Sequence, residues 1–300
     1  MNLQILKNAI RSPRQTALQV IARRQPTWLF RNYVCLARKQ GLTRPTLILS
    51  FDCDRDRDAE AALDVTGQLM EIGICPVFAV PGTNLEQNGD IYREIALRGC
   101  EFINHGYLPH AYWDDENARF ESCTFYHEMR PEDIAEDIRK GHETLVKILG
   151  KAPDGFRGPH FGTFQKKSQL RFLHRTLRDL GYRYSSSTTP WYGFLHGPLY
   201  RTQSGIVEIP VSGCFDAPLN ILDSWSFFSG RKERLTPQDY RDQLVKMVDY
   251  FAAGDSPALL NFYADPSHVA GRSEFFDAMC YASERIHIWR SFQEMLDSNG

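Results

Sequence analysis

The pattern of hydrophobic and polar positions changes at about residue 45. From there on, short apolar runs alternate with longer segments in which apolar residues recur every three or four positions. The apolar runs predict strands over residues 45–51, 75–80, 100–104, 182–186, 206–211 and 258–263, and the periodic segments predict helices over residues 59–72, 91–98, 131–149, 170–180 and 237–254. This alternation predicts an α/β fold whose parallel sheet is closed, or nearly closed, into a (β/α) barrel.

Residues 1–44 lack the alternation and predict a helical extension in front of a barrel domain over residues 45–300. Ser12-Pro13 is a typical helix start, and a second helix is expected from about Pro26 to Gly41. The extension is either a module that binds a membrane surface or a polyanion, or a helical hairpin packed on the barrel with solvated arginines. A transit peptide is a third interpretation.

Charge is distributed unevenly along the chain. The first 51 residues contain nine Lys or Arg and no Asp or Glu, whereas the whole chain has 35 basic and 37 acidic residues. No aromatic-basic interleaving or RNA-binding motif is present, so a nucleic-acid partner is not expected. A basic front end instead predicts peripheral contact with a membrane through residues 1–44.

Cysteines and apolar runs indicate the compartment. The seven cysteines are scattered and contain no CxxC pair, which predicts reduced thiols in a reducing compartment. The first 25 residues hold no apolar stretch that could form a signal-peptide core, and nowhere is there a run of about 18 apolar residues. We therefore expect a cytoplasmic protein, peripheral at the inner face of the membrane.

Polar residues follow several of the predicted strands, where a barrel of this kind carries its function. The first apolar run ends in Asp52 and Asp54, the third leads to His105 and His110, and later strands lead into the segments Phe156–His160 and Tyr263–His268. One Asp and two His are a common ligand set for a divalent transition metal, and a second carboxylate can then act as a base. The alternative for the two acids is a solvated charge cluster, because Arg55-Asp56-Arg57-Asp58 follows directly.

Four motifs occur in the order and at the intervals of one known family. They are Phe51-Asp52-Cys53-Asp54, Asn104-His105-Gly106-Tyr107 with His110, Phe156-Arg157-Gly158-Pro159, and Gly181-Tyr182-Arg183-Tyr184-Ser185-Ser186. Over roughly residues 45–290 the chain resembles the NodB-type polysaccharide deacetylases, which form carbohydrate esterase family four. The resemblance implies a distorted (β/α) barrel and a metal-dependent hydrolase that removes N-acetyl groups, in preference to O-acetyl groups, from sugars.

The resemblance also implies roles for individual residues. Asp52 matches the family's general base, and Asp54 matches the metal-binding Asp in the branch that spaces its two acids as Asp-x-Asp. His105 matches the first metal histidine, and Arg157 matches the arginine that orients and charge-pairs the base. Zinc is the expected metal, with cobalt, nickel, iron and manganese as alternatives.

Two histidine positions depart from the family pattern. The family spaces its two metal histidines four residues apart, whereas His105 and His110 are five apart; His110 is the expected ligand and His127 the substitute. At the late strand, Tyr263 stands where the family has its catalytic histidine. Either His268 swings back from the following loop as the general acid, or Tyr263 occupies the position with a different function.

A further departure concerns the support of the arginine. Ser185 stands where the family often has an Asp, and if that acid steadies the arginine, Asp216 or Asp223 would have to replace it. These departures keep two alternatives to a sugar deacetylase open. One is a carbohydrate-binding protein that has kept the fold but lost the reaction, and the other is an amide hydrolase of the same superfamily that acts on a small molecule.

Aromatic residues in predicted loops are candidates for stacking against sugar rings. These residues are Tyr107, Tyr112, Trp113, Trp191, Tyr192 and Trp225. The side chains expected to contact the substrate are Tyr107, Pro159, His160, Trp191, Trp225 and Tyr263. The expected substrate is an acetylated sugar or glycan, nucleotide-linked or lipid-linked, used in surface-polysaccharide assembly.

Overall fold

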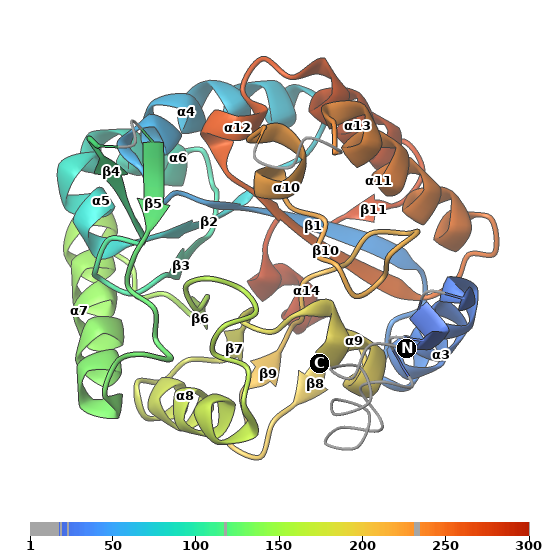
Figure 1. Ribbon diagram of the computed structural model, residues 1–300, viewed down its shortest axis with the longest axis horizontal. Helices are drawn as coiled ribbons and strands as arrows, with labels where there is room; N and C mark the ends of the chain where they lie inside the picture. The colour runs from blue at the N-terminus through green and yellow to red at the C-terminus, as the bar shows by residue number, and fades with distance from the viewer. Residues whose placement is uncertain (1–17, 19, 23, 117–118, 231–234, 300) are drawn as a thin grey trace.

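The structure, a computed structural model, describes residues 18, 20–22, 24–116, 119–230 and 235–299. Strands lie at its centre and helices surround them (Figure 1). The described strands are β1 (Pro45–Asp52), β2 (Val77–Val80), β3 (Phe102–Asn104), β4 (Ala111–Asp114), β5 (Arg119–Ser122), β6 (Gly155–Phe156), β7 (Tyr184–Ser185), β8 (Tyr200–Arg201), β9 (Val207–Glu208), β10 (Ala258–Ala264) and β11 (His287–Ile288).

One curled sheet contains most of these strands, in the order β10, β1, β2, β3, β6, β7, β9, β8, with β11 pairing beside β1. Its neighbouring strands are parallel, except that β8 and β9 are antiparallel. Strands β4 and β5 form a separate antiparallel hairpin. The curled, mainly parallel sheet confirms the predicted fold class, a distorted (β/α) barrel.

The helices cover the outside of the sheet (Figure 1). Among the described residues they are α3 (Pro26–Lys39), α4 (Asp56–Glu71), α5 (Gly82–Gln87), α6 (Gly89–Leu97), α7 (Pro131–Leu149), α8 (Lys167–Asp179), α9 (Pro190–His196), α10 (Ser224–Phe228), α11 (Pro237–Ala252), α12 (Pro266–Val269), α13 (Ser273–Ser283) and α14 (Phe292–Ser298). None of the described helices is both long enough and apolar enough to cross a lipid bilayer.

The central strands are apolar on both faces because both faces are covered. Every residue of β1 and of β10 is buried. Leu47 and Leu49 point into the large core cluster, whereas Ile48 between them belongs to a second cluster on the other face. The continuous apolar run before Asp52 is therefore the signature of a strand that carries its carboxylate out of the core at its carboxyl end.

The two ends of the curled sheet meet without a strand ladder. The backbone N–H of Ser212, which lies beyond β9, donates to the carbonyl oxygen of Asn261 in β10 at 2.8 Å. The side-chain amide of Asn261 in turn donates to the carbonyl oxygens of Ile209 and Pro210, at 3.1 and 3.2 Å. The Ser212 hydroxyl also accepts the backbone N–H of Asn261 at 2.9 Å, so one backbone bond and the side chains of Asn261 and Ser212 join the barrel at this seam.

Helix α3 packs against the barrel through one face. Phe30 contacts the rings of Phe194 and Phe251, with centroid distances of 5.8 and 5.7 Å. The hydroxyl of Tyr33 donates to the carbonyl oxygen of Leu259 in β10 at 2.6 Å. The helix follows the predicted bounds closely, because Pro26 occupies its first turn and Gly41 adopts a φ of 89° just after its end.

The long helices and core strands lie close to their predicted positions, and the shorter elements were missed. The sequence pattern did not predict α5, α9, α10, α12, α13, α14 or the hairpin of β4 and β5. These segments are too short, or too weakly periodic, to show a repeat of 3.6 or 2 residues. The helix expected to start at Ser12-Pro13 lies largely outside the described residues.

Candidate metal centre and active site

A cavity of about 390 Å³ lies where several strands of the sheet end. Asp52 is the last residue of β1, and Asp54 follows two residues later. His105 comes directly after β3, and Arg157 directly after β6. The cavity is lined by Asp52, Asp54, His105, His110, Ala111, Ser122, Phe125, His160, Phe161, Asp223, Trp225, Ser226, Tyr263 and Asp265.

The loop after β3 is shaped by contacts with α7. The carboxylate of Asp137, on α7, accepts the backbone N–H groups of Tyr107 and Leu108 at 3.0 and 2.7 Å. Gly141 lets the helix approach this loop, since a Cβ atom at Gly141 would lie 2.5 Å from the carbonyl oxygen of Gly106. The fixed loop brings the His105 and His110 rings together despite their five-residue spacing.

Asp54, His105 and His110 form a cluster that could hold a metal ion, with ligand atoms all within 4.8 Å of one another. Oδ1 of Asp54 lies 3.5 Å from Nε2 of His105 and 3.1 Å from Nδ1 of His110. The two imidazole rings stand edge to face, with centroids 4.3 Å apart. The alternative ligand His127 lies elsewhere, half-exposed beside Glu128.

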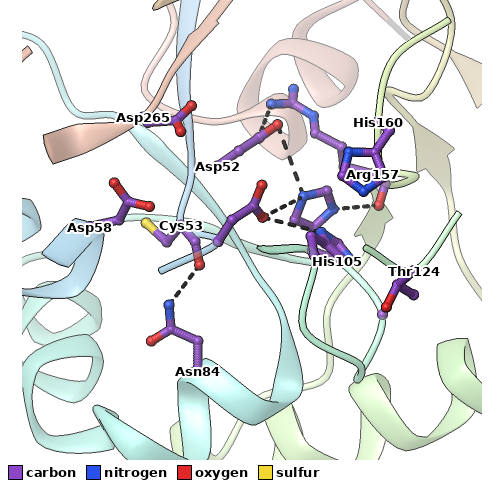
Figure 2. A network of polar contacts seen from close by, with 12 residues as sticks. Asp52, Cys53, Asp58, Asn84, His105, Thr124, Arg157, His160 and Asp265 are labelled. Carbon is purple, nitrogen blue, oxygen red and sulfur yellow. Dashed lines mark hydrogen bonds and ion pairs between the residues drawn. The ribbon is translucent and has the colours of Figure 1, made fainter. Parts of the chain in front are cut away.

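Two further observations fit a metal at this cluster. Nδ1 of His105 donates to the carbonyl oxygen of Arg157 at 2.8 Å (Figure 2). The other ring nitrogen, Nε2, is thereby left to face Asp54. Histidines that ligate metals are commonly fixed in this way through their second nitrogen. Nε2 of His110 is buried and has no hydrogen-bond partner among the described residues, which leaves a polar atom for a ligand to satisfy.

The charges of the cluster support each other. Burial by itself would raise the pKa of Asp54, but His110 and His105 hold that pKa well below its usual range. Burial likewise works to lower the pKa of His105, but Asp54 and Asp52 raise it above its ordinary value. Asp54 is therefore ionised at neutral pH, which is the form that ligates a cation.

Asp52 is held apart from this cluster by Arg157. The Arg157 Nη1 donates to Oδ1 of Asp52 at 2.6 Å, and the other oxygen, Oδ2, lies 4.0 Å from Nε2 of His105 (Figure 2). Arg157 is fully buried and also donates to the hydroxyls of Ser50 and Ser186, at 2.8 and 3.1 Å. The carboxylate is thus oriented with one oxygen occupied and one oxygen facing the cluster.

A model of one known protein family matches the part of the chain that carries the site residues. The polysaccharide deacetylase family model matches residues 39–185, a stretch that includes Asp52, Asp54, both clustered histidines and Arg157. Residues 39–185 belong to the polysaccharide deacetylase family. No curated protein sequence matches the chain.

Solved structures agree on the fold of the chain. One similar structure is described as a polysaccharide deacetylase from Mycobacterium smegmatis, with 17% identity, a TM-score of 0.62, and coverage of 86% of this chain and 90% of that chain. A second is described as a polysaccharide deacetylase from Pseudomonas aeruginosa PAO1, with 13% identity, a TM-score of 0.62, and coverage of 86% and 91%. A third, PuuE allantoinase, has 12% identity, a TM-score of 0.63, and coverage of 86% and 90%.

The family's missing acid is replaced by hydroxyl groups. Neither Asp216 nor Asp223 takes the place of Ser185 as a support of the arginine: Asp216 pairs with Lys246 at 2.7 Å, and Asp223 caps α10. The hydroxyls that hold Arg157 instead come from Ser50 and Ser186. The support expected from a carboxylate is neutral in this protein.

His268 does not line the cavity, in contrast to the expectation that it swings back as the general acid. Its Nε2 faces Nη1 of Arg55 at 3.2 Å, and its Nδ1 faces the hydroxyl of Ser224 at 3.2 Å. The Arg55 guanidinium also pairs with Asp58 at 2.9 Å and with Asp265 at 2.6 Å. His268 is therefore part of a buried polar network behind the cavity wall.

Replacing His268 with Gln tests this placement. We expect kcat to change by less than about threefold and the free energy of unfolding to fall by about 1–2 kcal/mol, because Gln cannot satisfy Arg55 and Ser224 with the same geometry. Steady-state assays and urea unfolding measure the two effects. A loss of kcat of about 100-fold or more at unchanged stability would instead establish His268 as the proton donor.

Only some of the predicted substrate contacts line the cavity. His160, Trp225 and Tyr263 line the cavity, whereas Tyr107 and Pro159 do not. The Tyr107 hydroxyl instead donates to Glu86 at 2.9 Å, which turns the ring away from the cluster.

Several of the six aromatic residues expected in loops lie in regular elements. Tyr112 and Trp113 belong to β4, Trp191 and Tyr192 to α9, and Trp225 to α10. Trp191 lines a separate groove of about 1470 Å³, which shares Asp223 and Ser226 with the reaction cavity. Trp191 therefore lies outside the reaction cavity, and its contact with the substrate stays a prediction.

Sequence analysis missed a buried acidic group opposite the cluster. Asp265, directly after β10, lines the cavity, and it shares the Nη2 group of Arg55 with Asp58. Burial and the nearby Asp58 raise the pKa of Asp265 well above its ordinary value, although Arg55 opposes this. The signal available in the sequence was the place of Asp265 directly after an apolar strand.

Proposed function

We propose that the protein is a metal-dependent hydrolase that removes an acetyl group, N-acetyl in preference to O-acetyl, from a sugar or glycan. The observation that supports this most directly is the division of labour between Asp52 and Asp54. Asp54 faces two histidines in a metal-type cluster, and Asp52, two residues away, is held by Arg157 with one oxygen turned toward that cluster. Zinc best suits one carboxylate and two imidazoles, with cobalt, nickel, iron and manganese as alternatives.

Asp52 is placed to act as the base. A divalent ion held by Asp54, His105 and His110 would polarise the acetyl carbonyl group and lower the pKa of a water molecule. Oδ2 of Asp52 faces the cluster and accepts the proton from the attacking water, while Arg157 fixes Oδ1 through a hydrogen bond. The new bond forms between the water oxygen and the acetyl carbon, and the bond from that carbon to the sugar nitrogen breaks.

We propose that the proton returns to the leaving nitrogen from Asp52 itself. His160 is the remaining histidine in the cavity lining, but its Nε2 donates to the carbonyl oxygen of Cys123 at 2.6 Å. Burial and the nearby His110 also lower the pKa of His160, so Nδ1 is unprotonated at neutral pH. Asp52 carries a proton after the attack and faces the same reacting atoms. The same carboxyl group can therefore accept the proton from water and donate it to the leaving nitrogen.

An acetate-release assay tests the proposed function. Metal-free protein is reconstituted with one equivalent of Zn²⁺ and incubated with N-acetylglucosamine oligomers, O-acetylated xylan oligomers and, because an allantoinase shares the fold, allantoin. We expect acetate from the N-acetylated oligomers, its loss with a chelator, and its recovery with metal. Metal-loaded protein that binds the oligomers without hydrolysing them would favour a carbohydrate-binding protein, and hydrolysis of allantoin alone would favour an amide hydrolase for small molecules.

We also propose that the substrate sugar is linked to a nucleotide or a lipid, and that the enzyme works in the cytoplasm at the inner face of the membrane. All seven cysteines are free thiols, which suits a reducing compartment. Residues 1–44 are then a basic extension of the catalytic domain, which occupies residues 45–300. Comparing acetate release from free, nucleotide-linked and lipid-linked N-acetylated sugars tests the substrate class.

Trp225 is the aromatic side chain expected to stack on the reacting sugar. Its ring lies over the Arg55 guanidinium, 4.9 Å from the Cζ atom, and lines the cavity. Replacing Trp225 with Ala is expected to raise KM about five- to twentyfold with a smaller change in kcat, since sugar stacking contributes mainly to binding. Trp113→Ala is the matched control, because Trp113 does not line the cavity. Equal effects of the two substitutions would contradict this role.

A further inference from the structure

Helix α3 has an outer face that the barrel does not use. Trp28, Arg31, Cys35, Arg38 and Lys39 are all exposed. At about 100° per residue, these five positions lie within an arc of about 100° on the helix. They therefore form one continuous stripe, which we call the α3 outer face.

The opposite side of α3 holds the helix in place. Leu29, Phe30, Tyr33 and Ala37 are buried against the barrel. The backbone carbonyl of Thr27 also accepts a hydrogen bond from the Tyr250 hydroxyl of α11 at 3.4 Å. Because the packing of α3 on the barrel comes from these buried residues, the residues of the outer face make no contribution to the core.

The cations of the α3 outer face have no acidic partner among the described residues. No carboxylate of the described residues lies within ion-pair distance of Arg31, Arg38 or Lys39. Several exposed arginines on or beside other helices do pair with an Asp or Glu; these include Arg93, Arg98, Arg130, Arg139 and Arg178. The first 51 residues of the sequence contain no acidic residue, so this face has a positive field without local compensation.

Trp28 adds an apolar group to this positive stripe. Its side chain is 51% exposed, although an indole ring of this size is usually packed when it serves only a fold. A tryptophan among cations suits the boundary between water and lipid, where the ring lies among headgroups and the cations meet phosphates. A single indole on a convex helix offers no row of stacking platforms of the kind that single-stranded nucleic acids use.

We propose that the α3 outer face docks on the surface of an anionic phospholipid bilayer, with Trp28 entering the headgroup layer and Arg31, Arg38 and Lys39 contacting lipid phosphates. The proposal gives a structural basis to the proposed location of the enzyme at a membrane and does not depend on its chemistry. It also assigns the contact to α3, the described helix of the N-terminal extension.

Vesicle flotation with the full chain tests the proposal. The vesicles contain either phosphatidylcholine alone or phosphatidylcholine with 30% phosphatidylglycerol. Wild-type protein is expected to bind the anionic vesicles at least tenfold more strongly than the neutral ones. The triple variant Arg31→Gln, Arg38→Gln, Lys39→Gln is expected to lose that difference, and Trp28→Ala to weaken binding at least threefold. Brominated lipid is expected to quench the tryptophan fluorescence of the wild-type protein, and this quenching is expected to be lost in Trp28→Phe, which keeps the other four tryptophans.

Matched variants separate this face from general surface charge. The triple variant Arg93→Gln, Arg98→Gln, Arg139→Gln removes three exposed cations elsewhere, and Trp113→Ala removes a tryptophan that is 49% exposed. Both are expected to bind vesicles as wild type does. The proposal is overturned if these controls weaken binding equally, if neutral vesicles bind as well as anionic ones, or if the protein binds single-stranded DNA but no vesicles. Acetate release from a soluble oligomer stays unchanged in all α3 variants, so a failure of docking is distinguishable from a failure of the proposed deacetylase activity.

Discussion

Replacing Asp52 with Asn is expected to lower kcat for acetate release by about 10³- to 10⁴-fold while the metal content stays at about one ion per chain. Loss of a positioned general base typically costs 10²- to 10⁴-fold, and the same residue is here assigned both proton transfers. Arg157 donates to Asp52 at 2.6 Å in the structure, and the side-chain oxygen of Asn can still accept this hydrogen bond. We therefore expect the variant to keep its fold.

Steady-state kinetics, metal analysis by mass spectrometry and thermal unfolding together measure this outcome. Asp56→Asn is the control, because Asp56 is an exposed acid of the first turn of α4 and lies only four residues away. If Asp52→Asn keeps activity within about tenfold of wild type, the base must be another group, and Asp265 across the cavity would be the next to test.

Replacing Asp54 with Ala is expected to remove the metal and to abolish measurable acetate release. Asp54 is the member that contacts both histidines of the cluster, so its loss removes one ligand and the carboxylate that balances the cation. We expect less than about 0.1 divalent ion per chain after dialysis, against about one in wild type.

The histidine alternatives can be separated in the same experiment. His110→Gln is expected to behave like Asp54→Ala, whereas His127→Gln is expected to keep the metal, because His127 is half-exposed beside Glu128. Metal retention in Asp54→Ala together with loss in His127→Gln would place the ion at a different site. Intact folding is checked by circular dichroism, so an unfolded variant is not mistaken for a metal-free one.

The core strands and the long helices were predictable because each is identified by the periodicity of its own residues. The apolar run of β1 and the 3.6-residue repeat of α7 are long enough to identify their elements without a partner. Acids and histidines at strand ends then predicted one shared site, since parallel strands bring their carboxyl ends to the same edge of the sheet. The structure brings Asp52, Asp54, His105 and His110 to one cavity in this way.

The environment of single side chains was not predictable in the same way. Arg55 and Asp58 stand in a run of alternating charges that is typical of a solvated surface, yet both are buried. Their burial depends on Asp265 and His268, more than two hundred residues away. Local sequence carries no signal for a partner at that distance, so a charged run that closes a buried network has the same appearance as one on the surface.

The buried amide that joins the two ends of the curled sheet has a mechanical consequence. A ring closed by hydrogen-bonded strands on all sides resists widening everywhere, but this ring has no strand ladder between Ser212 and Asn261 and is joined there by one backbone bond and these two side chains. Asn261→Ala would remove the side-chain bonds to Ile209 and Pro210 without removing any of the seven residue pairs between β1 and β10. Local opening of the barrel is therefore concentrated at the contact between Ser212 and Asn261. Backbone amides near this contact exchange with solvent sooner than those in the β1 ladder.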